Sequence, residues 1–213
     1  MNSSTDSKTT SNRGKRKTQD PCPGCSLHKN LCICAWIPSL TLQTKIVLVI
    51  HAKELRRTTN TGTLAVKALT NSQMFIRGKN LEALDLTPLL SEKYRTMLFY
   101  PSDKAIPLTP EFINLQDLPI QLIVPDGNWR QASKLQTRHL ELKNIPRVMI
   151  TKPNQAQHHL RKENSPEGMS TLQAIAEALG IIEGEFAREP LLKLYKKKLE
   201  HTLRGRGVLS ESV

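Results

Sequence analysis

Short apolar runs separated by longer amphipathic stretches make up most of the chain after residue 44, and this pattern limits the possible folds most strongly. The clearest run is KIVLVI at residues 45–50, directly before His51. A strand without a polar face must be covered on both sides. Further apolar runs lie at 74–76, 97–100, 120–124 and 147–150, and amphipathic stretches lie at 63–70, 128–139, 170–179 and 190–203. The sequence therefore predicts an α/β fold with a mainly parallel sheet and helices on both faces.

One of the expected helices, at residues 170–179, shows both of its boundaries in the sequence. Its apolar residues, among them Leu172, Ile175 and Leu179, recur at the spacing of one helix face. Ser170 is suited to cap the N-terminus of this helix, and Gly180 stands where it would end the helix. The helix is therefore expected to begin with a polar cap and to bury the face that follows.

All four cysteines of the chain lie within 13 residues, at Cys22, Cys25, Cys32 and Cys34. Two close pairs of thiolates can complete a tetrahedron around a zinc ion, and Gly24 allows the first turn to be tight. Four thiolate ligands leave no open coordination position, so such an ion would be structural. Reduced, unligated cysteines and an iron–sulfur cluster are the alternatives, and His28 is a competing ligand. Trp36 and Pro38 are expected to pack this zinc knuckle, residues 21–38, against the main domain.

The chain carries 31 Lys and Arg residues against 19 Asp and Glu residues, a net charge of +12. Chains of this charge usually bind polyanions, because basic residues near phosphates release condensed counterions. A solvated basic surface is the alternative. Binding to an acidic membrane would need an amphipathic or lipidated anchor, which the sequence does not show, and no apolar run approaches the length of a membrane span. The sequence also lacks a secretory signal, so a cytoplasmic protein is expected.

Charge and composition also divide the chain into segments. Residues 1–20 are polar and basic and are expected to form a disordered tail. Residues 39–204 are expected to form the main domain, and residues 205–213 a flexible C-terminus. The segment 193–206 contains six basic residues and one acidic residue. Its lysines, including Lys196 and Lys197, are expected to contact nucleic-acid phosphates.

Three polar clusters directly follow expected strands, and ligands of parallel sheets bind at the carboxyl ends of the strands. The first cluster contains His51, Glu54, Arg56, Arg57, Asn60, Thr61 and Gly62, and the second Asp126, Asn128 and Trp129. The third begins at Thr151 and continues to Arg161, Ser170 and Thr171. Structural roles are the alternative, since Asn60, Thr61 or Asp126 could cap a helix and Trp129 could pack in the core. The shared position after strands favours one common site.

In this order the motifs resemble the DTW-domain family of tRNA-uridine aminocarboxypropyltransferases. The resemblance covers about residues 20–200. It rests on the cysteine knuckle, the stretch from His51 to Gly62, the motif Asp126-x-x-Trp129-x-x-Ala132 and the helix start Ser170-Thr171-x-x-Ala174. The family's naming motif usually has Thr where this chain has Asn128, and Gln173 stands where the family often has an acidic residue.

The resemblance implies a SPOUT-like α/β sheet whose C-terminal part is threaded into a knot that binds S-adenosylmethionine. It implies transfer of the 3-amino-3-carboxypropyl group to N3 of a tRNA uridine, near position 47 of the variable loop, with release of 5′-methylthioadenosine. The sequence contains neither a glycine-rich Rossmann loop nor a Walker motif, in agreement with this fold. The chain is expected to act as a monomer, without an obligatory protein partner.

The motifs also imply roles for individual residues. Asp126 is the first candidate for the base that removes the uridine proton, and Glu54 is the second. The residues expected to bind the cofactor are Pro125, Asp126, Trp129, Ala132, Ser170 and Thr171. The residues expected to bind tRNA are His51, Arg57, Asn60, Thr61, Arg161, Lys196 and Lys197. The alternatives are a zinc-containing RNA-binding module without catalysis and a SPOUT RNA methyltransferase, which would transfer the methyl group instead.

Overall fold

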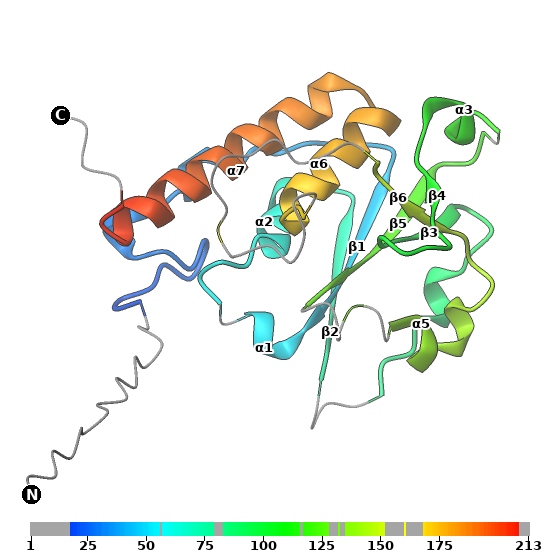
Figure 1. Ribbon diagram of the computed structural model, residues 1–213, viewed down its shortest axis with the longest axis horizontal. Helices are drawn as coiled ribbons and strands as arrows, with labels where there is room; N and C mark the ends of the chain where they lie inside the picture. Colours follow the sequence, from blue (N-terminus) through cyan, green and yellow to red (C-terminus); the bar gives the residue numbers. More distant parts are fainter. Residues whose placement is uncertain are drawn as a thin grey trace, which may run out of the picture.

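A six-stranded sheet forms the centre of the computed structural model (Figure 1). The structure describes residues 18–55, 57–78, 83–115, 117–127, 132, 135–151, 160 and 168–208. The strands are β1 (Lys45–His51), β2 (Ser72–Arg77), β3 (Arg95–Phe99), β4 (Ile106–Pro107), β5 (Ile120–Asp126) and β6 (Arg147–Met149). Their order is β2-β1-β5-β3-β6-β4, and each of these neighbouring pairs is parallel. The predicted parallel α/β fold is confirmed, and the short strand β4 was not predicted.

Side chains of β1 alternate between two separate cores, which explains why the whole strand is apolar. Ile46, Leu48 and Ile50 pack in the larger core with α2 (Gly62–Ala68), α6 (Thr171–Ile182) and α7 (Glu185–Gly205). Val47 and Val49 pack on the other face with α5 (Leu135–Arg138) and the 3₁₀ helices η3 (Thr87–Leu89) and η4 (Leu140–Leu142). Figure 1 shows α6 and α7 on one side of the sheet and α5 on the other. The predicted cover on both faces is therefore confirmed.

Short helical turns complete the described chain. They are η1 (Lys29–Leu31), η2 (Cys34–Trp36), α1 (Ala52–Leu55) and α3 (Pro110–Ile113). Of the helix expected at 128–139, Ala132 and α5 are helical, and residues 128–131, 133 and 134 lie outside the described residues. The predicted knot depends on the path of residues 152–159 and 161–167, which also lie outside them. None of the described helices combines the length and the apolarity that a membrane span requires.

The N-terminus of α6 agrees with the sequence, but its C-terminus does not. Ser170 forms a capping box, in which its Oγ accepts the N–H of Gln173 and the Gln173 side chain accepts the N–H of Ser170. The helix continues past Gly180 to Ile182. A Cβ atom at Gly180 would lie 2.5 Å from the Cδ atom of Arg188, so this glycine allows α7 to pack closely instead of ending the helix.

The last helix begins at Glu185, five residues before the predicted start at Pro190. Arg188 holds the additional turn, because it pairs with Glu177 of α6 at 2.9 Å and with Glu185 at 2.7 Å. A proline usually marks the first turn of a helix, since its missing N–H costs a hydrogen bond further in. Here one ion pair between α6 and α7 and one within α7 stabilise a turn that the sequence pattern alone does not indicate.

The central position of β5 leads to a stability prediction. Leu122 is fully buried in the larger core, so Leu122→Ala should lower the free energy of unfolding by about 2–5 kcal/mol. Leu140→Ala is the matched control, because Leu140 is exposed and should change stability by less than about 0.5 kcal/mol. Urea unfolding of both variants measures the difference. Equal losses would contradict this description of the core.

Candidate active site and metal site

A cavity of about 130 Å³ lies at the carboxyl end of β5. Its described lining residues are Thr59, Asn60, Thr61, Asp126, Gly127, Leu160, Met169, Ser170 and Thr171. These residues come from all three polar clusters that follow strands in the sequence. The structure thus brings together Asp126, Asn60, Thr61, Ser170 and Thr171 in one place, as the parallel arrangement of the strands requires.

Asp126, the last residue of β5, lines this cavity. Its side chain is buried, its Oδ2 accepts the amide N–H of Asn60 at 2.7 Å, and its Oδ1 accepts the hydroxyl of Thr171 at 2.9 Å. Donors on both oxygens stabilise the ionised carboxylate. The site therefore presents a fixed negative charge held by two segments that lie 66 and 45 residues away in the chain.

Asn60 joins this carboxylate to helix α2. Its Oδ1 accepts the N–H and the hydroxyl of Thr63, at 3.1 and 3.0 Å, so Asn60 caps α2 as the sequence had suggested for Asn60 or Thr61. Because the side-chain oxygen faces these donors, the amide nitrogen must face Asp126. One side chain thus serves as helix cap and as donor to the site.

Thr61 connects α2 to α6 instead of capping its own helix. Its Oγ1 accepts the backbone N–H of Leu172 at 3.2 Å. The N–H of Gln173 is likewise used by the capping box of Ser170. Two of the first-turn N–H groups of α6 are therefore occupied within the protein. A ligand at this end of the helix would meet side-chain hydroxyls more than free backbone amides.

Gly62 has a role that the sequence did not reveal. A Cβ atom at this position would lie 2.6 Å from Oδ2 of Asp126 and 3.1 Å from Cδ1 of Leu48. The absence of a side chain lets α2 begin directly beside the carboxylate. Thr59, Gly127, Leu160 and Met169 also line the cavity without having been predicted. Their only signal in the sequence was their position next to predicted residues.

Glu54, the second candidate base, lies outside the cavity lining. Its carboxylate is buried in α1, and Arg57 places its Nε 3.1 Å from Oε1. The guanidinium of Arg57 is partly exposed and is engaged in this ion pair. The buried Glu54 and the partly exposed Arg57 therefore support the turn that leads to Asn60, whose N–H donates to the carbonyl of Arg57 at 2.9 Å.

His51 ends β1 beside Arg77 of β2, also outside the cavity lining. Its Nδ1 accepts the N–H of Lys53 at 3.1 Å. Burial lowers the pKa of His51, and the positive charges of Arg77 and Lys53 lower this pKa further. The imidazole is therefore neutral near pH 7 and is not a cationic contact for phosphate.

The remaining predicted cofactor and substrate residues fall into two groups. Pro125 and Ala132 are buried and do not line the cavity. Trp129 and Arg161 lie outside the described residues.

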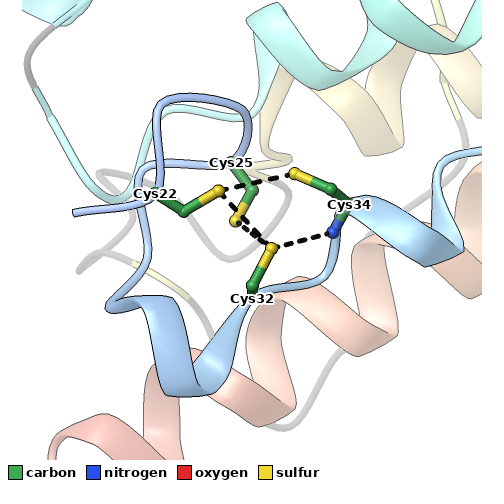
Figure 2. Close-up of side chains that lie close together, drawn as sticks. All are labelled: Cys22, Cys25, Cys32 and Cys34. Atoms are coloured by element: carbon green, nitrogen blue, oxygen red, sulfur yellow. Dashed lines mark hydrogen bonds between the residues drawn. The ribbon is translucent and has the colours of Figure 1, made fainter.

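The four cysteines form a second, separate site (Figure 2). Their Sγ atoms all lie within 4.8 Å of one another, and the Cys22–Cys32, Cys22–Cys34 and Cys25–Cys32 distances are 3.4, 3.6 and 3.9 Å. Four thiolates at about 2.3 Å from a tetrahedral zinc ion are separated by about 3.8 Å. The cluster therefore fits a structural zinc ion. His28 accepts the N–H of Asn30 and is not part of the cluster.

The surroundings of the cluster support this interpretation. A Cβ atom at Gly24 would lie 2.4 Å from Sγ of Cys34, so only glycine fits the first turn. Backbone N–H groups of Cys25 and Gly24 lower the pKa of Cys22 to about 6, whereas burial and the neighbouring thiols raise the pKa of Cys34 to about 12. Four thiols this close cannot all ionise unless a cation is present among them.

Lys198 of α7 faces the cysteine cluster, although the sequence placed it on a surface that contacts phosphates. It is fully buried, and its Nζ donates to the carbonyl of Cys25 at 2.6 Å. Burial lowers the pKa of Lys198 to about 8, and the thiols of Cys25, Cys22 and Cys34 oppose this shift. The lysine-rich helix is thus fixed to the knuckle from inside.

Other basic residues of α7 do reach the surface. Lys196 is exposed, and Lys197 is partly exposed and pairs with Glu200 at 3.0 Å. Arg204 pairs with the same glutamate at 2.6 Å.

Trp36 packs against the main domain less closely than predicted: its ring contacts Nζ of Lys197 in α7, 4.9 Å from the ring centroid. Its residue is 56% exposed, and the fully buried Ile33 enters the core in its place. His201 of α7 also contacts the knuckle, through the carbonyl of Leu31 at 3.1 Å. Ile33 and these polar contacts are sufficient to attach the knuckle, so Trp36 is left on the surface.

Comparison with known proteins places the chain in one family. The model of the DTW domain matches residues 19–203. The chain is 24% identical over 183 residues to tRNA-uridine aminocarboxypropyltransferase 2 of Macaca fascicularis, with 83% of this chain and 61% of that protein covered. It is 24% identical to the protein of the same name in Mus musculus (84% and 64% covered) and to tRNA-uridine aminocarboxypropyltransferase A of Arabidopsis thaliana (83% and 78%). The chain spans less than two thirds of the two animal proteins. No solved structure matches the chain significantly.

The cysteine cluster predicts that the purified protein binds about one zinc ion per chain. Cys32→Ser should release the ion and lower the thermal unfolding midpoint, because a structural zinc site contributes directly to folding. Metal analysis and thermal unfolding measure both effects. His28→Ala is the control and should retain the metal, since His28 lies outside the cluster. Retention of zinc by Cys32→Ser would contradict the four-thiolate site.

The close approach of Gly62 to Asp126 predicts an energetic coupling between the two positions. Gly62→Ala should lower the free energy of unfolding by about 1–3 kcal/mol, because the new methyl group overlaps the carboxylate. The same substitution in an Asp126→Ala background should cost about 1 kcal/mol less. Urea unfolding of the two single variants and the double variant gives the coupling energy. A coupling energy of zero would show that the new methyl group does not conflict with the carboxylate of Asp126.

Proposed function

Because the chain belongs to the DTW-domain family, we propose that it transfers the 3-amino-3-carboxypropyl group of S-adenosylmethionine to N3 of a tRNA uridine. The product left from the donor is 5′-methylthioadenosine, and the proposed target is the uridine near position 47 of the variable loop. The names of the relatives, all tRNA-uridine aminocarboxypropyltransferases, support this class of reaction. The observation that carries the proposal is the buried carboxylate of Asp126 in a cavity rich in hydroxyl groups.

The donor set of the cavity fits the amino-acid part of S-adenosylmethionine. That part carries an ammonium group, a carboxylate and a nearby sulfonium, so it needs one anionic partner and one set of neutral donors. Asp126 supplies the anion. Thr61 and Ser170 each accept a backbone N–H through Oγ, so each can donate its own hydroxyl proton to a ligand carboxylate. The described cavity, at about 130 Å³, is smaller than a typical ligand pocket of roughly 300 Å³ or more, and it would hold this part of the molecule.

When bound, S-adenosylmethionine would supply a methylene carbon made electrophilic by the attached sulfonium. The protein's task is then to hold the donor and the uridine in line, which requires positioning more than covalent chemistry. Asp126 is suited to hold a cationic group, because Asn60 and Thr171 stabilise its ionised form. We therefore assign Asp126 to cofactor binding in preference to proton removal.

Glu54 is less well supported as the base than Asp126. Its carboxylate is buried against Arg57 and is not part of the cavity lining. A structural role, supporting the turn that carries Asn60, accounts for these contacts. We propose in addition that the four cysteines hold a structural zinc ion and that the protein acts in the cytoplasm, where tRNA substrates are available.

The decisive experiment follows the label from two forms of S-adenosylmethionine into bulk tRNA. Label in the carboxypropyl carbons should reach the RNA, and label in the methyl group should not. Mass spectrometry of the nucleosides then identifies the modified uridine and its position. Transfer of the methyl label would support a methyltransferase instead. Binding of tRNA without transfer of either label would support an RNA-binding module.

Asp126→Asn separates the two roles of this residue. Loss of the charge should weaken cofactor binding by about 10- to 100-fold, because a hydrogen bond to a charged group contributes about 1.5–3 kcal/mol. Calorimetric titration with S-adenosylmethionine measures this loss. The control is Asp103→Asn at an exposed aspartate, which should bind normally. Unchanged cofactor affinity together with a large fall in kcat would instead support the role of base.

A further inference from the structure

Trp36 is an exposed aromatic side chain on a firmly held turn. It ends η2, two residues after Cys34, and its N–H donates to the carbonyl of Ile33 at 2.9 Å. Ile33 itself is fully buried in the larger core, so the turn is anchored at both the core and the cysteine cluster. A tryptophan that remains 56% exposed on such a turn gains little from packing inside the protein. An exposed aromatic group of this size is typical of a contact surface.

The charge beside Trp36 indicates the chemistry of the partner. Nζ of Lys197 lies over the indole ring, 4.9 Å from its centroid. Lys193 lies one helical turn before Lys197 on the same side of α7, and its side chain is 71% exposed. The surrounding segment 193–206 contains six basic residues and one acidic residue. Lys197 covers one face of the indole, so a base would stack on the other face. Lys193, which also pairs with Glu189 at 3.0 Å, and Lys197 would then lie beside the flanking phosphates of that base.

We propose that Trp36 and the adjacent face of α7, at Lys193 and Lys197, form an RNA-docking surface on which an unpaired base stacks against the indole. The proposal rests on the proposed function only in taking RNA as the substrate. It replaces the more general expectation that all lysines of α7 contact phosphates, since Lys198 is buried at the cysteine cluster.

The position of this surface relative to the cavity shows which part of the RNA it would hold. Arg206, at the end of α7, donates to the carbonyl of Leu160 at 2.9 Å, and Leu160 lines the cavity. Arg206, the C-cap of α7, follows Lys197 by nine positions, a rise of about 14 Å at 1.5 Å per residue. This length equals about four stacked base steps of 3.4 Å. The stacked base is therefore not the target uridine but another nucleotide of the same RNA.

The test compares two ligands of equal charge, an unstructured RNA decanucleotide and an abasic ribose-phosphate chain of the same length. Trp36→Ala should weaken binding of the decanucleotide about tenfold and leave binding of the abasic chain unchanged, because only the first ligand can stack. Trp36→Phe should recover part of the affinity. Phe186→Ala is the matched control, since Phe186 is 63% exposed near the opposite end of α7. Zinc content and cofactor affinity should equal those of the unmodified protein in all three variants.

Two results would overturn the proposal: unchanged affinity of Trp36→Ala for the decanucleotide, or an equal loss for both ligands. If RNA binding depends on Trp36 but no carboxypropyl label reaches tRNA, the proposed function is refuted and the docking surface stands. Conversely, label transfer by Trp36→Ala with an unaltered KM for tRNA would refute the docking surface and leave the proposed function intact.

Discussion

The carboxylate of Asp126 is the point on which the arrangement of the site depends. It closes β5, receives one hydrogen bond from the cap of α2 and another from the first residue of α6, and therefore fixes two helix starts relative to the sheet. The contact from Thr61 to Leu172 joins the same two helices directly. Polar side chains buried in this way are stable only when each is satisfied. The site is thus built as one connected set of hydrogen bonds, and each member has a structural task besides any contact to a ligand.

Because each of these side chains serves both the fold and the site, the sequence could predict where the site lies but not the contacts within it. The apolar runs predicted the strands, and the parallel order made it necessary that Asp126, Asn60 and Thr171 meet at one edge. Their individual partners depend on distances of a few tenths of an ångström, which no spacing rule contains. Gly62 is the clearest case, since its importance arises only from the carboxylate oxygen 2.6 Å from where a Cβ atom would lie.

The C-terminal helix shows a different limit of sequence reasoning. Pro190 predicted a late start, but ion pairs of Arg188 with α6 stabilise an additional turn. Lys198 and Lys197 are neighbours of the same type, yet the first is buried at the cysteine cluster and the second lies over an exposed indole ring. Composition records their shared charge, whereas their opposite environments follow from the direction in which each side chain leaves the helix.

The contact between Lys198 and Cys25 has a consequence for charge balance. Four thiolates around a divalent zinc ion carry a net charge of about −2, and the buried ammonium group offsets about half of it. Without the ion the same ammonium group would keep its place only at the cost of an incompletely compensated buried charge. The metal centre would then join the cysteine knuckle to the last helix, through Cys25 and Lys198, which are 173 positions apart in sequence. Loss of zinc would therefore weaken the attachment of α7 as well as the fold of the knuckle.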